Sequence, residues 1–259
     1  MLKQRGIPDG VERSSTVISF TVLNHESWVL LLKVVSHEKF SGVFWIEEEK
    51  RRFLAVKSSL KGFQVHGERL AASEGNEYRS WDPNTSKLSA AIVKELKALP
   101  FQKGCRVLYL GSASGVTPSF ISDLVGENGV VYCVEFSPRM MREFLLKCEK
   151  KRNLLPILAD ARKPGGYSEM VGEKVDLVYQ DVAQPDQAEI LLENAEKFLK
   201  PNGCAMLAIK SQSIDVTKPP NEVYEMVLKK LGPKFEVLQK IELSPFDKGH
   251  LFVLLKAKK

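Results

Sequence analysis

Three carboxylates of this chain follow three segments that have the apolar character of buried β-strands. Glu135 ends one segment, Asp160 comes directly after the next, and Asp181 comes shortly after a third. In an open α/β sheet, ligands bind beyond the carboxyl ends of the strands. Glu135 stands 24 residues after Gly111, close to the spacing at which an acid accepts hydrogen bonds from ribose hydroxyls. Asp160 suits an adenine amino group, so the pattern predicts a site for a ligand that contains a nucleoside.

A loop of small residues, from Gly111 to Thr117, follows the first strand of the same region. Small residues let the backbone approach a ligand closely, although an isolated Gly-x-x-x-Gly also occurs in ordinary strand-to-helix turns. The loop lacks the Gly-x-Gly-x-x-Gly pattern that holds a pyrophosphate. S-adenosylmethionine fits better, because it offers adenine and ribose to the carboxylates, an amino-acid tail to the loop, and a cationic sulfonium that tolerates nearby acids.

The elements that must position these residues alternate along the chain after about residue 80. Strands that alternate with amphipathic helices predict a parallel sheet with crossover helices. The last two strands are joined by a short loop and form a hairpin. We therefore predict an α/β fold of the class I S-adenosylmethionine-dependent methyltransferase type, with a mostly parallel seven-stranded sheet and an antiparallel C-terminal hairpin. The expected strands are 106–110, 130–135, 155–159, 175–179, 204–209, 235–243 and 251–255, and the expected helices include 85–99, one capped by Ser137, 185–199 and 221–231.

The region before residue 80 has a different pattern, with short β-rich runs at 17–23, 28–35, 42–47 and 53–57. These runs predict a small antiparallel sheet, with the charged stretch from Glu47 to Arg52 as a hairpin turn. We expect three parts, and the second of them could also include strands from 17–35. They are an unassigned N-terminal extension at 1–36, a small β domain at 37–77 and the methyltransferase domain at 78–259.

Composition excludes several classes of protein. Of 259 residues, 44% are apolar, which is too many for a disordered chain, and no apolar run approaches the roughly 18 residues of a membrane span. We expect a soluble, cytoplasmic protein without a membrane partner.

The net charge of +6 permits a polyanionic partner without requiring one. The four cysteines lack zinc-site or redox-pair spacing, so we expect no metal site and buried, reduced thiols.

Six short strings carry a resemblance to a known family: YRSWDP at 78–83, SKL at 86–88, LYLGSASG at 108–115, VEFS at 134–137, DVAQPDQA at 181–188 and SID at 213–215. They resemble fibrillarin, the RNA 2′-O-methyltransferase of box C/D guide ribonucleoproteins, over about residues 40–259. Eukaryotic fibrillarins begin with a Gly/Arg-rich tail that this chain lacks, so it resembles the archaeal form. The string at 181–188 is the most specific.

The resemblance implies transfer of a methyl group from S-adenosylmethionine to ribose 2′-hydroxyls of rRNA and of tRNA, during pre-rRNA and tRNA processing. The family usually has Thr-Thr where this chain has Val116 and Thr117, so a hydroxyl contact at the first position is lost. With the glycine loop, the expected cofactor-binding residues are Gly111, Ala113, Gly115, Val116, Thr117, Glu135, Phe136, Asp160, Ala161, Asp181, Val182, Ala183 and Gln184.

Methyl transfer to a ribose 2′-hydroxyl needs a group that orients or deprotonates it, because this hydroxyl does not ionise at neutral pH. The resemblance implies a catalytic tetrad of Lys87, Asp181, Lys210 and His250. A lysine held in a partly desolvated site between carboxylates can accept or relay a proton. We expect Lys210 to face the hydroxyl, Asp181 to position it, and Lys87 and His250 to tune the charge and hold the nucleotide. Taken alone, each of these charges could equally be solvated.

The chain has no aromatic signature of an RRM and no KH-type loop, and its basic clusters at 147–152 and 256–259 are interpreted as solvated faces. An enzyme whose target is chosen by a guide RNA fits this. The resemblance implies as partners the box C/D guide RNA and its substrate RNA, a Nop-domain scaffold protein and a kink-turn-binding ribosomal-type protein.

Three other functions remain as alternatives at this point. A non-catalytic subunit of the particle is disfavoured by the intact Glu135, Asp160, Asp181 and Lys210. A NAD-dependent oxidoreductase is disfavoured by the glycine pattern and by the C-terminal hairpin. A metal-assisted O-methyltransferase of small molecules would be distinguished by its sensitivity to a chelator.

Overall fold

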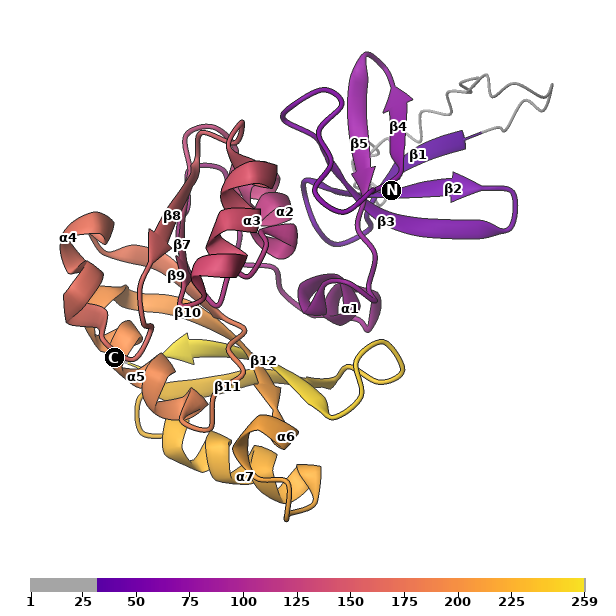
Figure 1. Cartoon of the computed structure of the whole chain (residues 1–259). Helices are drawn as coiled ribbons and strands as arrows, with labels where there is room; N and C mark the ends of the chain where they lie inside the picture. Colours follow the sequence, from indigo (N-terminus) through magenta and orange to yellow (C-terminus); the bar gives the residue numbers. More distant parts are fainter. Residues whose placement is uncertain (1–31, 259) are drawn as a thin grey trace, which may run out of the picture.

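The computed structural model describes residues 32–258, which form two sheets (Figure 1). The N-terminal sheet is antiparallel, in the order β1-β2-β3-β5-β4. Its strands are β1 (Leu32–Ser36), β2 (Val43–Glu48), β3 (Arg51–Lys57), β4 (Leu70–Ser73) and β5 (Asn76–Ser80). This sheet therefore includes a strand ahead of residue 37 and another that crosses residue 77.

The larger sheet has seven strands in the order β11-β12-β10-β9-β6-β7-β8. The five strands from β10 to β8 pair in parallel, whereas β12 runs antiparallel to both β10 and β11. The predicted fold class is confirmed. The strands are β6 (Arg106–Leu110), β7 (Val130–Glu135), β8 (Leu154–Leu158), β9 (Val175–Gln180), β10 (Leu199–Lys210), β11 (Phe235–Glu242) and β12 (His250–Ala257).

Helices cover both faces of the larger sheet, because alternate residues of each strand point to opposite sides. Val107 and Tyr109 pack into one core with α1, α2 and α3, whereas Leu108 and Leu110 pack into a second core with α4, α5 and α7. The helices are α1 (Lys87–Val93), α2 (Val116–Val125), α3 (Pro138–Cys148), the 3₁₀ turn η1 (Pro164–Tyr167), α4 (Ser168–Val171), α5 (Gln187–Phe198), α6 (Ser211–Ile214) and α7 (Pro220–Leu231).

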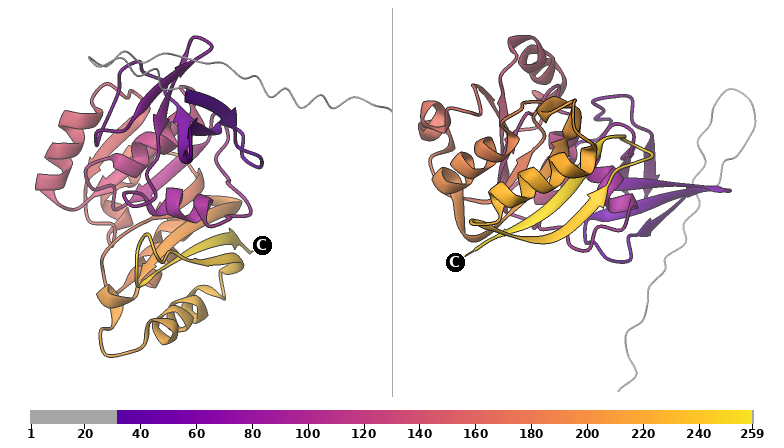
Figure 2. Two further views of the ribbon diagram at one scale, coloured as in Figure 1. Left: turned by 90° about the vertical axis from the view of Figure 1, so that its right-hand side faces the viewer. Right: turned by 90° about the horizontal axis from the view of Figure 1, so that it is seen from below.

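The N-terminal sheet packs on the α1 and α2 side of the larger domain, away from α7 (Figure 2). Val43 and Leu54 of this sheet belong to the same buried core as α2. Trp81, which follows β5, stacks on Phe120 of α2 with ring centroids 4.8 Å apart. This packing fixes the linker into α1 and therefore the position of Lys87 at the start of that helix.

Several boundaries differ from those predicted. The helix expected at 85–99 ends at Val93, because Glu95 adopts a φ of +64° that no α-helix contains, although Leu96 is still buried. Strand β10 begins at Leu199 instead of Cys204, with irregular register between these residues. Strands β4 and β5 were not predicted, since they are short and join through the polar Glu74 turn. The strand expected at 17–23 lies outside the described residues.

Two expectations from composition can be compared with the described residues. Of the four thiols, Cys133 and Cys148 are buried and unpaired, as expected, whereas Cys105 and Cys204 are partly exposed. None of the helices between residues 32 and 258 combines the length and apolar character needed to cross a bilayer.

Candidate functional site

A cavity of about 350 Å³ lies at the carboxyl ends of β6, β7, β8 and β9. Its volume falls within the range of roughly 300–1,000 Å³ that is typical of small-molecule sites. Ten of the thirteen predicted cofactor-binding residues line it, namely Gly111, Ala113, Glu135, Phe136, Asp160, Ala161, Asp181, Val182, Ala183 and Gln184.

Gly111 lines the cavity and lets the loop after β6 approach the backbone of Asp181 closely. Its φ is +83°, and a Cβ there would lie 2.4 Å from the Asp181 carbonyl oxygen. The Gly111 N–H donates to the Val134 carbonyl at 2.9 Å, while the Asp181 N–H donates to that of Leu110 at 2.9 Å. A side chain at residue 111 would push β9 and its following loop away, so the glycine holds Asp181 against the loop after β6.

Glu135 ties the two loops on the other side of the cavity together. One carboxylate oxygen accepts the Ala113 N–H at 2.8 Å and the other accepts the Ser137 N–H at 2.8 Å. A carboxylate has about four lone-pair sites, so each oxygen can accept one more hydrogen bond from a ligand. Glu135 is thus held in place by the backbone and keeps acceptor capacity toward the cavity.

The remaining wall combines an acid, an aromatic ring and an arginine. Asp160 accepts the N–H of Arg162 at 3.0 Å, and Phe136 is 67% exposed, an unusual state for a phenyl ring. The Arg162 guanidinium pairs with Asp186 at 3.0 Å and contacts Gln184. This wall offers a flat apolar surface beside a carboxylate, which suits an aromatic base with an amino group.

Three predicted cofactor residues lie outside the lining of this cavity. Gly115 has a φ of +91°, and a Cβ there would lie 2.5 Å from the Cys148 sulfur, so it permits α2 to pack on α3. Val116 packs against the buried core. The Thr117 hydroxyl donates to the Ser86 hydroxyl at 3.0 Å, joining α2 to the N-cap of α1.

Beside the cavity, four ionisable side chains form a connected group. Lys87 Nζ lies 3.0 Å from Asp181 Oδ2 and 3.6 Å from Asp247 Oδ2, and Asp247 Oδ1 lies 2.7 Å from His250 Nδ1. We call Lys87, Asp181, Asp247 and His250 the site cluster. Three of its members were predicted from the sequence, and Asp181 belongs both to the cluster and to the cavity wall.

The pKa values in the site cluster are set by burial and by the neighbouring charges. Burial opposes the charge on Lys87, but Asp181 and Asp247 together raise the pKa of this amine above its ordinary value. Burial lowers the pKa of His250. The Asp247 carboxylate raises this pKa, and the Lys87 charge lowers it further. Lys87 is therefore a fixed cation, whereas His250 is held in its neutral form.

Lys210 stands next to this cluster at the end of β10. It pairs in register with His250 on β12, and side chains directly opposite one another in an antiparallel pair lie on the same face. Its backbone N–H donates to Gln187 Oε1 at 3.2 Å. Within residues 32–258, its amine makes no ion pair or hydrogen bond. The backbone is thus fixed while the amine is available to a substrate.

Asp247 is the member of the cluster that the sequence interpretation missed. It lies three residues before His250 in the β11–β12 loop, and an acid so close to a predicted functional histidine was the available signal. Met140 and Arg162, which also line the cavity, were missed because neither follows a strand directly.

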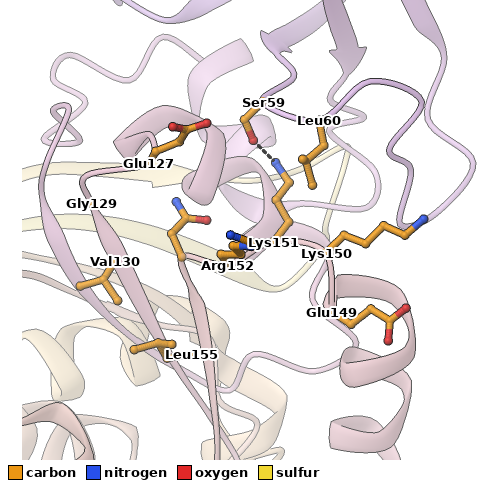
Figure 3. Close-up of a pocket in the computed structure, with 11 residues that line it drawn as sticks. Ser59, Leu60, Glu127, Gly129, Val130, Glu149, Lys150, Lys151, Arg152 and Leu155 are labelled. Atoms are coloured by element: carbon orange, nitrogen blue, oxygen red, sulfur yellow. Dashed lines mark hydrogen bonds between the residues drawn. The ribbon is translucent and has the colours of Figure 1, made fainter.

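A larger cavity, of about 860 Å³, lies at the amino ends of β7 and β8, and Figure 3 draws the residues that line it. It is formed where β7 and β8 begin, between Gly129, Asn153 and the Ser59 loop of the N-terminal sheet. None of the predicted site residues lines it. In Figure 3, the Lys151 amine points at Ser59, to which it donates a hydrogen bond of 2.8 Å. This cavity marks the junction of the two sheets and not the predicted site.

Comparison with known proteins agrees with this geometry. The Fibrillarin family model matches residues 34–259. The chain belongs to the fibrillarin family. It is 49% identical over 225 residues to the fibrillarin-like rRNA/tRNA 2′-O-methyltransferase of Methanopyrus kandleri, a match that covers 86% of this chain and 97% of the relative.

Two solved fibrillarin structures are similar to this one. The fibrillarin of Aeropyrum pernix, in complex with natively bound S-adenosyl-L-methionine, superposes with a TM-score of 0.81 and 43% identity, covering 88% of this chain and all of that one. A fibrillarin in complex with Nop5p superposes with a TM-score of 0.73 and 40% identity, covering 80% and 94% of the two chains. The resemblance inferred from the sequence strings is confirmed, and the fibrillarin match extends into β1.

Proposed function

We propose that this fibrillarin-family chain is an S-adenosylmethionine-dependent RNA 2′-O-methyltransferase that acts on rRNA and tRNA. The observation that carries the proposal is the double role of Asp181, which lines the ligand cavity and pairs with Lys87 of the site cluster. A cofactor pocket and a group of ionisable side chains thus share one residue, as methyl transfer between a cofactor and a hydroxyl requires. The activity named for the Methanopyrus kandleri relative and the cofactor bound by the Aeropyrum pernix structure support it.

The residues around the cavity fit S-adenosylmethionine chemically. Glu135 has acceptor capacity for ribose hydroxyls, and Asp160 lies beside the exposed Phe136 ring, where an adenine could stack and donate its amino hydrogens. The close approach permitted by Gly111 leaves room for an amino-acid tail along the loop after β6. When bound, the cofactor supplies an electrophilic methyl group on a positively charged sulfur.

The protein's part in the reaction is to position the ribose 2′-hydroxyl and to accept or relay its proton. Lys87 is a poor base, because two carboxylates raise its pKa and keep it protonated. Lys210 is the better group to face the hydroxyl, since its amine has no partner in the described part of the chain while its backbone is clamped by Gln187. Asp181 orients the Lys87 amine toward the reacting oxygen, and His250 contributes a neutral ring opposite Lys210.

The proposal extends to the particle in which the enzyme works. A Nop-domain scaffold is supported by the fibrillarin structure solved with Nop5p. We infer in addition a box C/D guide RNA, which would select the target by base pairing, and a kink-turn-binding protein. The moderate net charge of +6 is consistent with an enzyme to which partners bring the RNA.

The test is mapping of 2′-O-methylation in a target RNA after reconstitution with a guide RNA, a Nop-domain scaffold and a kink-turn protein. Methylation at one guide-matched nucleotide, lost when the guide is mismatched, is the expected result. Radiolabel transfer that persists in a strong chelator would exclude the metal-assisted alternative. Absence of transfer despite measurable S-adenosylmethionine binding would contradict the enzyme assignment and favour a non-catalytic subunit.

A further inference from the structure

The loop that carries Asp247 is held at both ends. The Leu243 carbonyl accepts the N–H of Phe246 at 2.9 Å and that of Asp247 at 3.2 Å. At the other end, the Gly249 carbonyl accepts the hydroxyl of Ser211 at 3.1 Å. Leu243 is fully buried and Phe246 packs against the core. Asp247 therefore projects from a turn whose backbone is fixed on the sheet.

Each carboxylate oxygen of Asp247 meets a different catalytic candidate. Oδ1 lies 2.7 Å from His250 Nδ1, and Oδ2 lies 3.6 Å from Lys87 Nζ. Because Lys87 also pairs with Asp181, the order of contacts is Asp181, Lys87, Asp247, His250. These four residues come from three separate parts of the chain. Among the described residues, Asp247 is the one side chain that contacts both His250 and Lys87.

The surroundings of His250 define which ring nitrogen carries the proton. Nδ1 faces the Asp247 carboxylate and, at 3.1 Å, the Lys248 carbonyl, and both groups can only accept. Nδ1 must therefore be the protonated nitrogen when the ring is neutral, which leaves Nε2 as an acceptor. Without the carboxylate, the Lys248 carbonyl alone would have to hold this tautomer.

We propose that Asp247 is a positioning residue that fixes His250 as its Nδ1–H tautomer, with Nε2 free to accept from the target nucleotide, and that shares Lys87 with Asp181. The role rests on the proposed function of the site cluster. Asp247 does not line the cofactor cavity, so in this proposal it acts on the nucleotide through His250 and not on the cofactor.

The charged and titratable groups that face His250 make a specific prediction about its ionisation. They are Asp247 on the same loop, Lys87 on α1 and Asp181 after β9, with Lys210 opposite on β10. Of these, Asp247 is the carboxylate in contact with the ring. Its removal leaves the nearby lysine charges less opposed, so the pKa of His250 should fall below the wild-type value.

The experiment compares Asp247→Ala, Asp247→Glu and the matched control Glu242→Ala, which removes an exposed carboxylate from the same hairpin. Nitrogen-15 NMR of labelled histidine in the full-length protein, with His250→Gln to assign the signal, reports tautomer and pKa without any RNA. We expect an Nδ1–H ring in the wild type, a mixed tautomer with a lower pKa in Asp247→Ala, recovery in Asp247→Glu, and no change in the control.

Kinetics in the reconstituted particle complete the test. Asp247→Ala should lower kcat by up to about 10²-fold through misplacement of the ring, with unchanged affinity for S-adenosylmethionine and partial rescue in Asp247→Glu. An Nε2–H ring in the wild type, or the same pKa in Asp247→Ala, would overturn the proposal, as would a loss of thermal stability without a change in the His250 spectrum. If the wild-type particle fails to methylate RNA while the NMR results hold, the proposed function fails and the Asp247–His250 assignment stands.

Discussion

Two clusters of ionisable side chains in this chain share lysine–aspartate pairs but differ in purpose. The interdomain cluster consists of Arg79 on β5, Asp123 on α2 and Lys151 after α3, with side chains 0%, 0% and 1% exposed. The site cluster is open by comparison, since its side chains are 9% to 34% exposed. Both contain lysine paired with aspartate. The difference lies in whether the acceptor sites of the carboxylate are filled.

Asp123 has three of its about four acceptor sites occupied by protein groups. It accepts from Arg79 at 2.7 Å, from the Ser59 N–H at 2.9 Å and from Lys151. These donors come from the N-terminal sheet and from the larger domain, so the cluster joins the two. In the site cluster, Asp181 accepts from the single side chain of Lys87 among the described residues. A closed cluster serves structure, whereas an open one keeps its capacity for a substrate.

The largest effect should come from removing a functional group at the open site. Lys210→Ala should lower methyl transfer by about 10²–10⁴-fold, the usual contribution of general acid–base catalysis. Its free energy of unfolding should change by no more than about 1 kcal/mol, since the amine has no partner in the described chain to lose. Single-turnover methylation and urea unfolding measure the two quantities. Lys229→Ala, at an exposed position on α7, is the matched control. Methyl transfer at the wild-type rate by Lys210→Ala would show that Lys210 has no part in the mechanism.

The closed cluster should give the reverse result. Asp123→Ala leaves Lys151 buried without its counter-ion and leaves Arg79 with Glu68 as its remaining carboxylate partner, which should cost about 3–5 kcal/mol of the free energy of unfolding. Below its melting temperature, the folded variant should still bind S-adenosylmethionine with wild-type affinity, because Asp123 is absent from the cofactor cavity. Urea unfolding and calorimetric titration of the cofactor test this. A variant as stable as the wild type would show that the cluster does not hold the two sheets together.

The sequence predicted the open site better than the closed cluster, for a physical reason. Buried parallel strands are apolar runs, so the residues after them, such as Glu135 and Asp181, could be located before any contact was known. Arg79, Asp123 and Lys151 lie on a polar strand, a helix and a loop that are far apart in sequence. The interpretation of 147–152 as a solvated face was wrong for Lys151, which is buried.

Within the site, some contacts could not be predicted from the sequence because tertiary packing decides them. Thr117 ends the glycine loop, and its hydroxyl donates to Ser86. Asp247 owes its role to a loop that folds back toward Lys87 on α1, 160 residues earlier in the chain. Neither contact has a local sequence signal, because both depend on how α1 packs against the sheet.

A smaller effect is expected in the cofactor cavity at Glu135. Backbone N–H groups occupy part of the acceptor sites of this carboxylate, and the rest are available to a ligand. Glu135→Gln keeps the size of the side chain but replaces one carboxylate oxygen with an amide donor that faces a backbone N–H. The amide group cannot accept from a ribose hydroxyl of the cofactor, and loss of one hydrogen bond to a charged acceptor costs about 1.5–3 kcal/mol. The affinity for S-adenosylmethionine should therefore fall by roughly 10- to 150-fold. Calorimetric titration measures it. Equal affinities would mean that Glu135 serves the loops alone.

The smallest effects should separate the two clusters by pH. The pKa of His250 is lowered from its ordinary value of 6.5, as is that of His37, so the folded state binds fewer protons than the unfolded one and stability falls as the pH drops below about 6.5. His250→Gln should remove its share of this slope. Asp123 has a pKa held below 3.8, because Lys151 and Arg79 outweigh its burial, so its contribution is present above 3.8 and is lost as the pH falls through the folded value. Unfolding in urea between pH 7 and about pH 2 should therefore show one loss near pH 6 and another below pH 3.8, where Glu38, Asp176 and Glu189, whose pKa values are also lowered, contribute together with Asp123. A slope near pH 6 that is the same in His250→Gln would mean that the open cluster does not titrate as its contacts require.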